Sequence, residues 1–429
     1  MANQNVFCAV PWHNTHLYWD GSYGACCSES HKPVNNQSEN IKDLSLQQWY
    51  TGDTMKNFRQ RILGDQPLSE CSSCYYEESF GYQSRRIREN YKVGIFTKQA
   101  FQKSFTQSKW YPIFNNGVTK LPIDWHIDFG NECNLACKMC SPLASSQIAN
   151  QYVKWHIDFQ KSDSWVNNNE SWQQFLNNIE QTKKLHRIHV MGGEPTINKK
   201  FLQFVNWLIE KKLTDIELSF VTNGTKLDFN LIANLKKFKN VDIEISVEST
   251  ENNNSYIRQG SDTNLVWQNI ETYCQLRSPT LSVILRSVPQ LLSVNTYHKY
   301  ILRAYNLGLS IQSIPLRQPS YMAIPIIPYA IRQQFRDNFT SLKETIKKDN
   351  ITNLKTISLG RDTSRLAEQL IIECDTIVNF LDSDQLINVE AQRLELISWL
   401  VRWDKIYNLN AMQIYPEYAN FFKEYGYSF

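Results

Sequence analysis

Apolar positions change their period along the chain. From residue 121 to residue 317, apolar runs of strand length alternate with amphipathic stretches of helical period. This pattern predicts strands at 122–129, 186–191, 215–222, 241–248, 280–288 and 309–317. It predicts helices between them at 142–158, 170–182, 197–212, 228–238, 263–276 and 295–307. Strands that alternate with helices indicate an α/β protein whose parallel sheet is built with right-handed crossovers.

The two flanking regions lack this alternation. The N-terminal region is rich in turns and cysteine, and its one predicted helix covers 44–63, where apolar residues recur at helical spacing. The C-terminal region has helical patterns, for example at 385–407. The pattern therefore predicts a cysteine-rich domain, a linker, an α/β domain and a helical extension, at 1–95, 96–120, 121–320 and 321–429.

Composition excludes few functions by itself. The chain has 429 residues, of which 42% are hydrophobic, and a net charge of +3, so a nucleic-acid partner is not favoured. The N-terminus lacks the basic-then-apolar pattern of a signal peptide. The longest apolar run, 322–331, contains two prolines and is far shorter than the ~18 residues of a membrane span. We expect a soluble, cytoplasmic protein.

The ten cysteines are unevenly placed, and eight of them lie in two groups. In a reducing compartment, grouped thiols indicate metal binding more than disulfides. The second group, Cys133, Cys137 and Cys140, follows the first predicted strand on one short loop. Three thiolates so close in sequence can hold three irons of a [4Fe–4S] cluster and leave the fourth iron open to a small molecule. Zinc prefers four ligands in closely spaced pairs, and no second pair lies nearby.

This Cys-x3-Cys-x2-Cys spacing resembles the signature of the radical S-adenosylmethionine (SAM) superfamily, and the resemblance extends from about Pro122 to Arg317. Met191-Gly-Gly-Glu-Pro195 is similar to the family's Gly-Gly-Glu-Pro motif, and Phe220-Val-Thr-Asn-Gly224 is similar to its Thr-Asn-Gly turn. The resemblance implies a partial (β/α)6 TIM-like barrel rather than an open doubly wound sheet. It also implies a [4Fe–4S] cluster that binds SAM, and a 5′-deoxyadenosyl radical that takes a hydrogen atom from the substrate.

The resemblance also implies a set of cofactor-binding residues. These residues are Met139 beside the adenine, the motif residues Gly192, Gly193 and Glu194, the turn residue Asn223, the strand-end residues Ser246 and Glu248, and Arg258 on the SAM carboxylate. Glu248 is a departure, because the family carries an Asp-type acid at this position. Each motif also has a simpler interpretation: ordinary turns for the glycines and Asn223, and a solvated surface side chain for Arg258.

The first group of cysteines resembles the SPASM/twitch module, which binds an auxiliary [4Fe–4S] cluster and usually follows the barrel. Here Cys8, Cys26, Cys71 and Cys74 precede it, so the chain resembles the subgroup with an N-terminal twitch domain. Cys8 and Cys26 are expected on a hairpin that turns at Asp20-Gly21. Cys26 and Cys27 would point to opposite faces if extended, so only one is expected to be a ligand, and the resemblance favours Cys26. A zinc site built from the same four cysteines, or Asp43 or water in place of one thiolate, stays open.

The expected function is that of a radical SAM enzyme acting on a ribosomally synthesised peptide or protein, by cross-linking, epimerisation or dehydrogenation. Its expected partners are a flavodoxin- or ferredoxin-type reductant and a separate recognition protein, because no leader-binding winged helix is evident. One alternative is a radical SAM enzyme for a small molecule, nucleotide or RNA base. Another is a non-enzymatic iron–sulfur or zinc protein.

Three residues are candidates for catalysis beyond the cofactors. Cys274 and Cys374 could donate a hydrogen atom to a substrate radical, although packed, inert thiols are the simpler interpretation. Asp128 shares a strand face with Asp124 and His126 and is the nearest of the three to the cysteine loop. His126 and His189 are expected in the core or lining the barrel.

Overall fold

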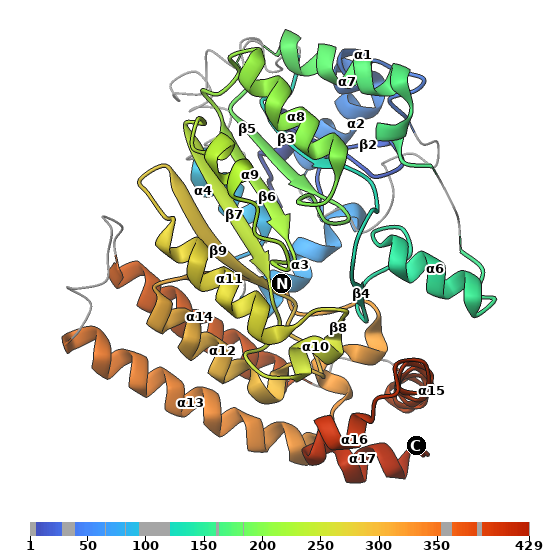
Figure 1. Ribbon diagram of the computed structural model, residues 1–429, viewed down its shortest axis with the longest axis vertical. Helices are drawn as coiled ribbons and strands as arrows, with labels where there is room; N and C mark the ends of the chain where they lie inside the picture. The colour runs from blue at the N-terminus through green and yellow to red at the C-terminus, as the bar shows by residue number, and fades with distance from the viewer. Residues whose placement is uncertain are drawn as a thin grey trace. The chain divides into compact units, whose positions relative to one another are not determined.

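The computed structural model describes residues 6–27, 39–64, 66–81, 83–93, 121–159, 163–182, 184–352, 363–383 and 388–428 (Figure 1). The predicted linker, 96–120, lies outside these residues. The chain divides into two compact units. Unit 1 comprises residues 1–134, 141–221 and 228–242, and unit 2 comprises 135–140, 222–227 and 243–429.

Eight strands form the main sheet, which is mostly parallel, so the predicted α/β fold class is confirmed. The strand order is β2-β1-β3-β5-β6-β7-β9-β10, with β2, β1, β3, β5 and nearly all of β6 in unit 1, β9 and β10 in unit 2, and β7 divided between the two units. These strands are β1 (Asn14–Leu17), β2 (Tyr23–Gly24), β3 (Asp124–Asp128), β5 (Arg187–Met191), β6 (Glu217–Thr222), β7 (Asn240–Ser246), β9 (Leu281–Ser287) and β10 (Ser310–Ser313). The six predicted strands correspond to β3, β5, β6, β7, β9 and β10.

The N-terminal region adds two strands that the sequence pattern does not predict as part of this sheet. β1 pairs in parallel with β3, and β2 pairs antiparallel with β1. The connection turns at Asp20-Gly21 as expected: Gly21 has φ 84°, and the Ser22 amide donates to Asp20 Oδ1 at 3.0 Å. Cys8 lies before this hairpin and Cys26 after it.

The helices of unit 1 follow the apolar periodicity, with one correction. The predicted helix 44–63 is two helices, α1 (Leu46–Thr51) and α2 (Asp53–Ile62), because Gly52 adopts an extended conformation between them. Ser45 and Gln48 form a capping box that begins α1. The remaining helices of this unit are α3 (Ser72–Ser79), α4 (Arg85–Val93), α6 (Ser146–Lys154), α7 (Asn169–Gln181), α8 (Lys199–Glu210) and α9 (Phe229–Leu235).

Phe129 directly follows β3 and fixes the end of this strand. Its ring packs against the rings of Trp165, Trp172, Phe175, Phe201 and Phe204, with centroids 5.5 to 6.1 Å apart. Each such pair contributes about 0.5–1.5 kcal/mol beyond simple burial. The loop that carries Cys133 therefore starts from a rigid position.

Unit 2 is mainly helical outside its strands, as predicted for the C-terminal region. The pairs among α12 (Val294–Leu307), α13 (Tyr329–Thr352) and α14 (Thr363–Leu381) are in contact, and these helices lie side by side (Figure 1). The other helices are α10 (Asn253–Ile257), α11 (Thr263–Gln275), α15 (Val389–Tyr407), α16 (Ala411–Ile414) and α17 (Ala419–Glu424). Among the described helices, we find none with the length and apolar character that a bilayer crossing requires.

Candidate metal and cofactor sites

The four N-terminal cysteines proposed as ligands all belong to unit 1, and several of their thiols influence one another. Burial, together with the nearby Cys74 thiol, raises the pKa of Cys8 to about 12. Burial likewise raises the pKa of Cys74. Cys71 lies at the start of α3, close enough to influence Tyr75. Buried thiolates in one place need a compensating cation, so this donor set fits a metal site. All ten cysteines are free of disulfides.

Cys26 and Cys27 do not lie in a strand, so the extended segment on which the expectation of opposite faces rested is absent. β2 ends at Gly24, before these residues. A hydrogen bond to Cys27 is the main cause that raises the pKa of the Cys26 thiol, with burial as the second cause. The two thiols therefore interact, and the choice of Cys26 as the fourth ligand stays a prediction.

Two consecutive arginines at the start of α4 place positive charge beside these cysteines. The Arg86 guanidinium donates to the Phe7 carbonyl at 3.0 Å and pairs with Glu78, beside Cys8. Arg85 is buried, and its guanidinium donates to the Cys27 sulfur. Burial lowers the pKa of Arg85, but the Cys27 and Cys26 thiolates raise it more, so this side chain is a permanent cation.

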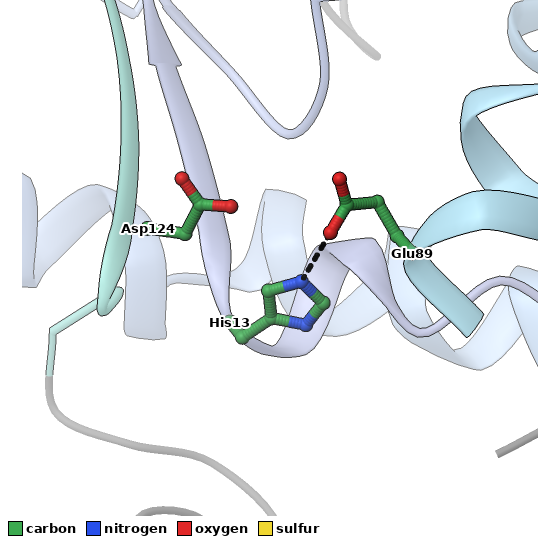
Figure 2. Close-up of side chains that lie close together, drawn as sticks. All are labelled: His13, Glu89 and Asp124. Carbon is green, nitrogen blue, oxygen red and sulfur yellow. Dashed lines mark ion pairs between the residues drawn. The ribbon is translucent and has the colours of Figure 1, made fainter. Parts of the chain in front are cut away.

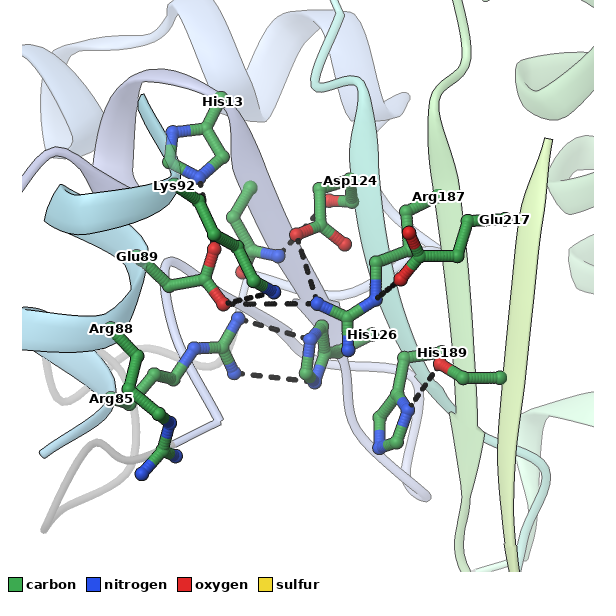
Figure 3. Close-up of polar contacts among 12 residues, drawn as sticks. His13, Arg85, Arg88, Glu89, Lys92, Asp124, His126, Arg187, His189 and Glu217 are labelled. Atoms are coloured by element: carbon green, nitrogen blue, oxygen red, sulfur yellow. Dashed lines mark hydrogen bonds and ion pairs between the residues drawn. The ribbon is translucent and has the colours of Figure 1, made fainter. Parts of the chain in front are cut away.

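The other side of Arg85 faces a row of histidines in the sheet. Its two terminal nitrogens lie 3.2 and 3.0 Å from the ring nitrogens of His126 (Figure 3). The register pairs His16 of β1 with His126 of β3, and His126 with His189 of β5. The His189 ring then meets the Ser219 hydroxyl at 2.7 Å. His126 and His189 are buried, as expected for core or barrel-lining residues.

Asp128 ends β3, and its carboxylate lies 3.2 Å from His16 Nε2. Burial lowers the pKa of His16, but Asp128 and Cys27 raise it, and the net direction is upward. Sequence reasoning missed His16 because its partner is more than a hundred residues away. The structure thus gives Asp128, a predicted catalytic candidate, an acid–base partner from the N-terminal region.

The first residues of the Cys133 loop pack against the Gly-Gly-Glu-Pro turn in unit 1. Gly193 has φ 59°, and a Cβ placed there would lie 2.2 Å from the Glu132 carbonyl oxygen. The Glu194 amide donates to the same oxygen at 2.7 Å. The Ser146 hydroxyl meets the main chain of Cys133 at 3.2 Å. The glycines are therefore required for close backbone contact, although here the contact is with the cysteine loop.

Unit 2 carries the rest of the cysteine loop. β4 (Ala136–Cys137) pairs antiparallel with β8 (Arg258–Gln259), which places Arg258 opposite Cys137. Arg258 Nη1 lies 3.7 Å from Cys137 Sγ, and Arg258 Nη2 pairs with Glu248 Oε1 at 2.5 Å. The second Glu248 oxygen accepts from the Val288 amide at 2.8 Å. The interpretation of Arg258 as a solvated surface side chain is wrong, since Arg258 is 8% exposed and Glu248 is fully buried.

Lys138, between the two cysteines, is a feature that the sequence did not reveal. Its ammonium donates to the Tyr256 carbonyl at 2.5 Å and lies 3.8 Å from the Tyr256 ring centroid. The rings of Trp403 and Tyr407 lie 5.2 and 5.7 Å away. Burial lowers the pKa of Lys138 to about 7, against the opposing effect of Asp404. The end of α15 thus encloses a residue of the cysteine loop in an aromatic cage.

The other predicted cofactor-binding residues have less distinctive surroundings. Glu194 is buried and accepts from the Thr196 amide and hydroxyl, and Asn223 accepts in the same way from Thr225. Met139 and Ser246 are half-buried. The roles assigned to these residues by resemblance stay predictions.

The two remaining catalytic candidates, Cys274 and Cys374, are buried in unit 2. Cys374 is fully buried in α14, and Cys274 lies on α11. Burial raises the pKa of both thiols, which is typical of packed, inert cysteines.

Unit 1 also contains an open pocket of about 460 Å³ beside the Cys133 loop. Its apolar wall includes Trp19 from the N-terminal region and Leu143, Val153 and Phe159. Asn131, Asn150 and Asp163 supply polar groups, and Ser146, which holds Cys133, also lines it. Val153 is 49% exposed, so the pocket opens to solvent.

Two family models match the chain. The model of an iron–sulfur cluster-binding domain, SPASM, matches residues 8–75, and the radical SAM superfamily model matches residues 127–288. The chain therefore contains a SPASM domain that precedes a radical SAM domain. Its cofactors are [4Fe–4S] clusters and SAM, and the cysteine sets described above suit them.

Comparison with solved structures gives distant similarities. Native anSMEcpe with bound AdoMet has 18% identity and a TM-score of 0.40, over 54% of this chain and 62% of that one. Streptococcus suis SuiB bound to S-adenosylmethionine has 12% identity and a TM-score of 0.38, over 70% and 64%. SuiB bound to its precursor peptide SuiA has 14% identity and a TM-score of 0.34, over 57% and 52%. The chain thus spans about three fifths of the length of the first of these structures. No curated protein matches the chain.

Proposed function

We propose that this radical SAM enzyme abstracts a hydrogen atom from a peptide or protein substrate, and that the outcome is a cross-link, an epimerised residue or a dehydrogenated residue. When bound, the first cluster and SAM supply the 5′-deoxyadenosyl radical. Cys133, Cys137 and Cys140 are the proposed ligands of that cluster. The Arg258–Glu248 pair fixes a buried positive group beside Cys137.

The observation that carries the substrate class is the open pocket beside the Cys133 loop. Its apolar wall suits an amino-acid side chain, and its amide and carboxylate groups suit the hydrogen bonds of a peptide main chain. The exposed side at Val153 leaves room for a longer chain to extend into solvent. A SPASM domain that supplies Trp19 to this wall supports the same choice.

The first experiment tests the radical chemistry. The protein is reconstituted anaerobically and given dithionite and SAM, and 5′-deoxyadenosine is measured against a Cys137→Ala control. We expect formation only with the intact cysteine loop. Equal amounts in both proteins would contradict the proposal and favour a non-enzymatic iron–sulfur protein. A flavodoxin- or ferredoxin-type reductant is the proposed physiological electron donor and can replace dithionite in the same assay.

The second experiment tests the substrate class. Short peptides encoded beside the gene are incubated with the active enzyme, and mass spectrometry detects loss of two hydrogen atoms or deuterium uptake from D2O. Val153→Glu should reduce peptide modification about tenfold while uncoupled 5′-deoxyadenosine formation persists. The control is Phe229→Glu, since Phe229 is 61% exposed in the same unit and lies outside the pocket. Modification of nucleosides or RNA and of no peptide would favour the alternative substrate classes.

A further inference from the structure

Three buried side chains of unit 1 meet at the N-terminal end of β3, away from the cysteine loop that follows its C-terminal end (Figure 2). His13 directly follows the short helix Val10–Trp12, Glu89 lies on α4, and Asp124 begins β3. Each is about 5% exposed. One ligating atom from each lies within 4.8 Å of the other two. An imidazole and two carboxylates from three separate segments thus converge on one small space.

The charged side chains around this space lie farther apart than hydrogen-bond distance at three of their approaches. His13 Nε2 lies 3.9 Å from Glu89 Oε2, and Arg187 Nη1 lies 3.7 Å from Glu89 Oε1 and 3.8 Å from Asp124 Oδ2. These separations exceed the length of a hydrogen bond, which indicates a small polar occupant between the groups. Asp124 Oδ1 is buried and has no hydrogen-bond partner among the described residues. A buried carboxyl oxygen without a hydrogen-bond partner is costly.

The neighbouring cations divide their contacts between this cluster and other groups. Arg187 Nε pairs with Glu217 at 3.3 Å, and Arg85 faces His126 (Figure 3). Arg85 also donates to the Cys27 sulfur. Lys92 reaches Glu89 at 3.2 Å, but its side chain is 53% exposed and can turn to solvent. Burial raises the pKa of Glu89, but His13, Lys92, Arg85 and Arg187 lower it more, so this carboxylate is ionised. The two buried carboxylates therefore share Arg187, whose Nη1 lies beyond hydrogen-bond distance of both.

We propose that His13, Glu89 and Asp124 bind a divalent metal ion that is separate from the iron–sulfur clusters. A mixed imidazole and carboxylate set suits Mn²⁺, Fe²⁺ or Zn²⁺, whereas the thiol sites select iron–sulfur clusters or zinc. With metal–ligand distances of about 2.1 Å, tetrahedral donors are about 3.4 Å apart, so ligand atoms within 4.8 Å of one another need to close by up to about 1.4 Å. The ion would join the N-terminal segment and α4 to β3 and act as a structural clip.

The experiment uses Mn²⁺, because carboxylate and imidazole ligands suit it and thiolates do not. Reconstituted protein is passed over a chelating resin and titrated with Mn²⁺, and free Mn²⁺ is measured by its room-temperature EPR signal. We expect one tightly held Mn²⁺ per chain, displaced by Zn²⁺ or Fe²⁺. Asp124→Asn and His13→Gln should each weaken binding by at least about tenfold. Asp215→Asn is the matched control, since this exposed carboxylate pairs with Lys239 outside the cluster.

A second measurement separates loss of the site from loss of the fold. Mn²⁺ should raise the thermal midpoint of the wild-type protein and of Asp215→Asn, but not that of Asp124→Asn, while the iron content per chain stays equal. If Asp124→Asn does not fold, His13→Gln gives the same comparison. Equal Mn²⁺ binding in wild type and Asp124→Asn, or none in either, would overturn the proposal and assign the space to water. None of these outcomes depends on radical chemistry or on the substrate.

Discussion

The two units surround their cysteines with positive charge in different ways. In unit 2, Arg258 faces Cys137 and is held by the fully buried Glu248, and the Lys138 ammonium also acts on this thiol. In unit 1, positive charge is spread over a network in which Arg85 contacts Cys27 and His126, and Arg187 links Asp124, Glu89 and Glu217. Its ion pairs are mostly longer than 3 Å, whereas the Arg258–Glu248 pair is 2.5 Å.

This difference indicates how each region responds to a substitution. A single buried pair has no substitute when one partner is removed, because the other charge stays in the interior without compensation. A network shares each charge among several partners, so the loss of one is partly offset by the rest. Substitutions in the Arg258–Glu248 pair should therefore have larger effects than substitutions in the unit 1 network.

The largest effect is expected for Arg258→Met. It leaves the Glu248 carboxylate buried without its cation, which typically costs about 3–5 kcal/mol of unfolding free energy. Chemical denaturation under anaerobic conditions measures this loss. The double variant Arg258→Met with Glu248→Gln is the control and should recover a substantial part of the lost stability, since it removes both charges. Equal losses in the single and double variants would mean that packing, rather than charge, holds this pair.

The next largest loss of unfolding free energy is expected for His16→Gln, and this loss depends on pH. Asp128 holds the pKa of His16 above its ordinary value of 6.5 although burial acts in the opposite direction, so the folded chain binds the proton more tightly than the unfolded chain. The stabilisation is therefore complete below about pH 6.5 and disappears as the pH rises through the raised pKa. His16→Gln should cost about 3 kcal/mol near pH 5.5 and clearly less near pH 9.

Denaturation curves at several pH values measure this dependence. His156→Gln is the control, because His156 is exposed in the same unit. The groups around His16 other than Asp128 are Cys27, which also raises the pKa, and Arg85, which lowers it. A loss that is the same at every pH would show that His16 is neutral in the folded chain.

A smaller effect is expected for Arg85→Lys. A lysine keeps the charge but not the planar fork that reaches both His126 nitrogens and the Cys27 sulfur. We expect a loss of about 2 kcal/mol, the scale of hydrogen bonds to charged groups, together with a change in the EPR spectrum of the auxiliary cluster. Arg88→Lys, on the same helix and partly exposed, should change neither quantity. An unchanged spectrum in Arg85→Lys would separate this arginine from the cluster.

The sequence predicted those features that depend on residues close together in the chain. The six strands of the α/β region and most helices follow from apolar periodicity, and the cysteine spacing identifies the superfamily. The break at Gly52 was missed because periodicity continues across it, although a glycine within a helical pattern was a usable signal. The sequence also left open whether Cys26 and Cys27 are extended, because this depends on where β2 ends, at Gly24.

The rest depends on contacts between distant segments. The pairing of β1 with β3 brings His16 to Asp128 and His13 to Asp124, and no pattern within either segment encodes this register. The two-residue strands β4 and β8, which place Arg258 opposite Cys137, are too short to give a periodic signal. Lys138 was passed over because a lysine between two ligands resembles a solvated residue until α15 supplies its aromatic cage. Resemblance supplied Arg258 and Glu248 as separate residues, and the structure joins them as a pair.

The smallest loss of stability is expected for breaking an exposed ion pair in the same unit as Arg258. This loss is the reference against which the loss in Arg258→Met is judged. Lys299 Nζ lies 2.6 Å from Glu251 Oε1, nearly as close as the buried pair, but the two side chains are 52% and 46% exposed. Water and salt screen such a pair, so Lys299→Met should change the unfolding free energy by less than about 1 kcal/mol, and less at high salt. Measured beside Arg258→Met under identical conditions, it separates the contribution of burial from that of distance. If the two variants lost similar stability, short contact distance alone would explain the strength of the Arg258–Glu248 pair, and the distinction between a buried pair and a shared network would fail.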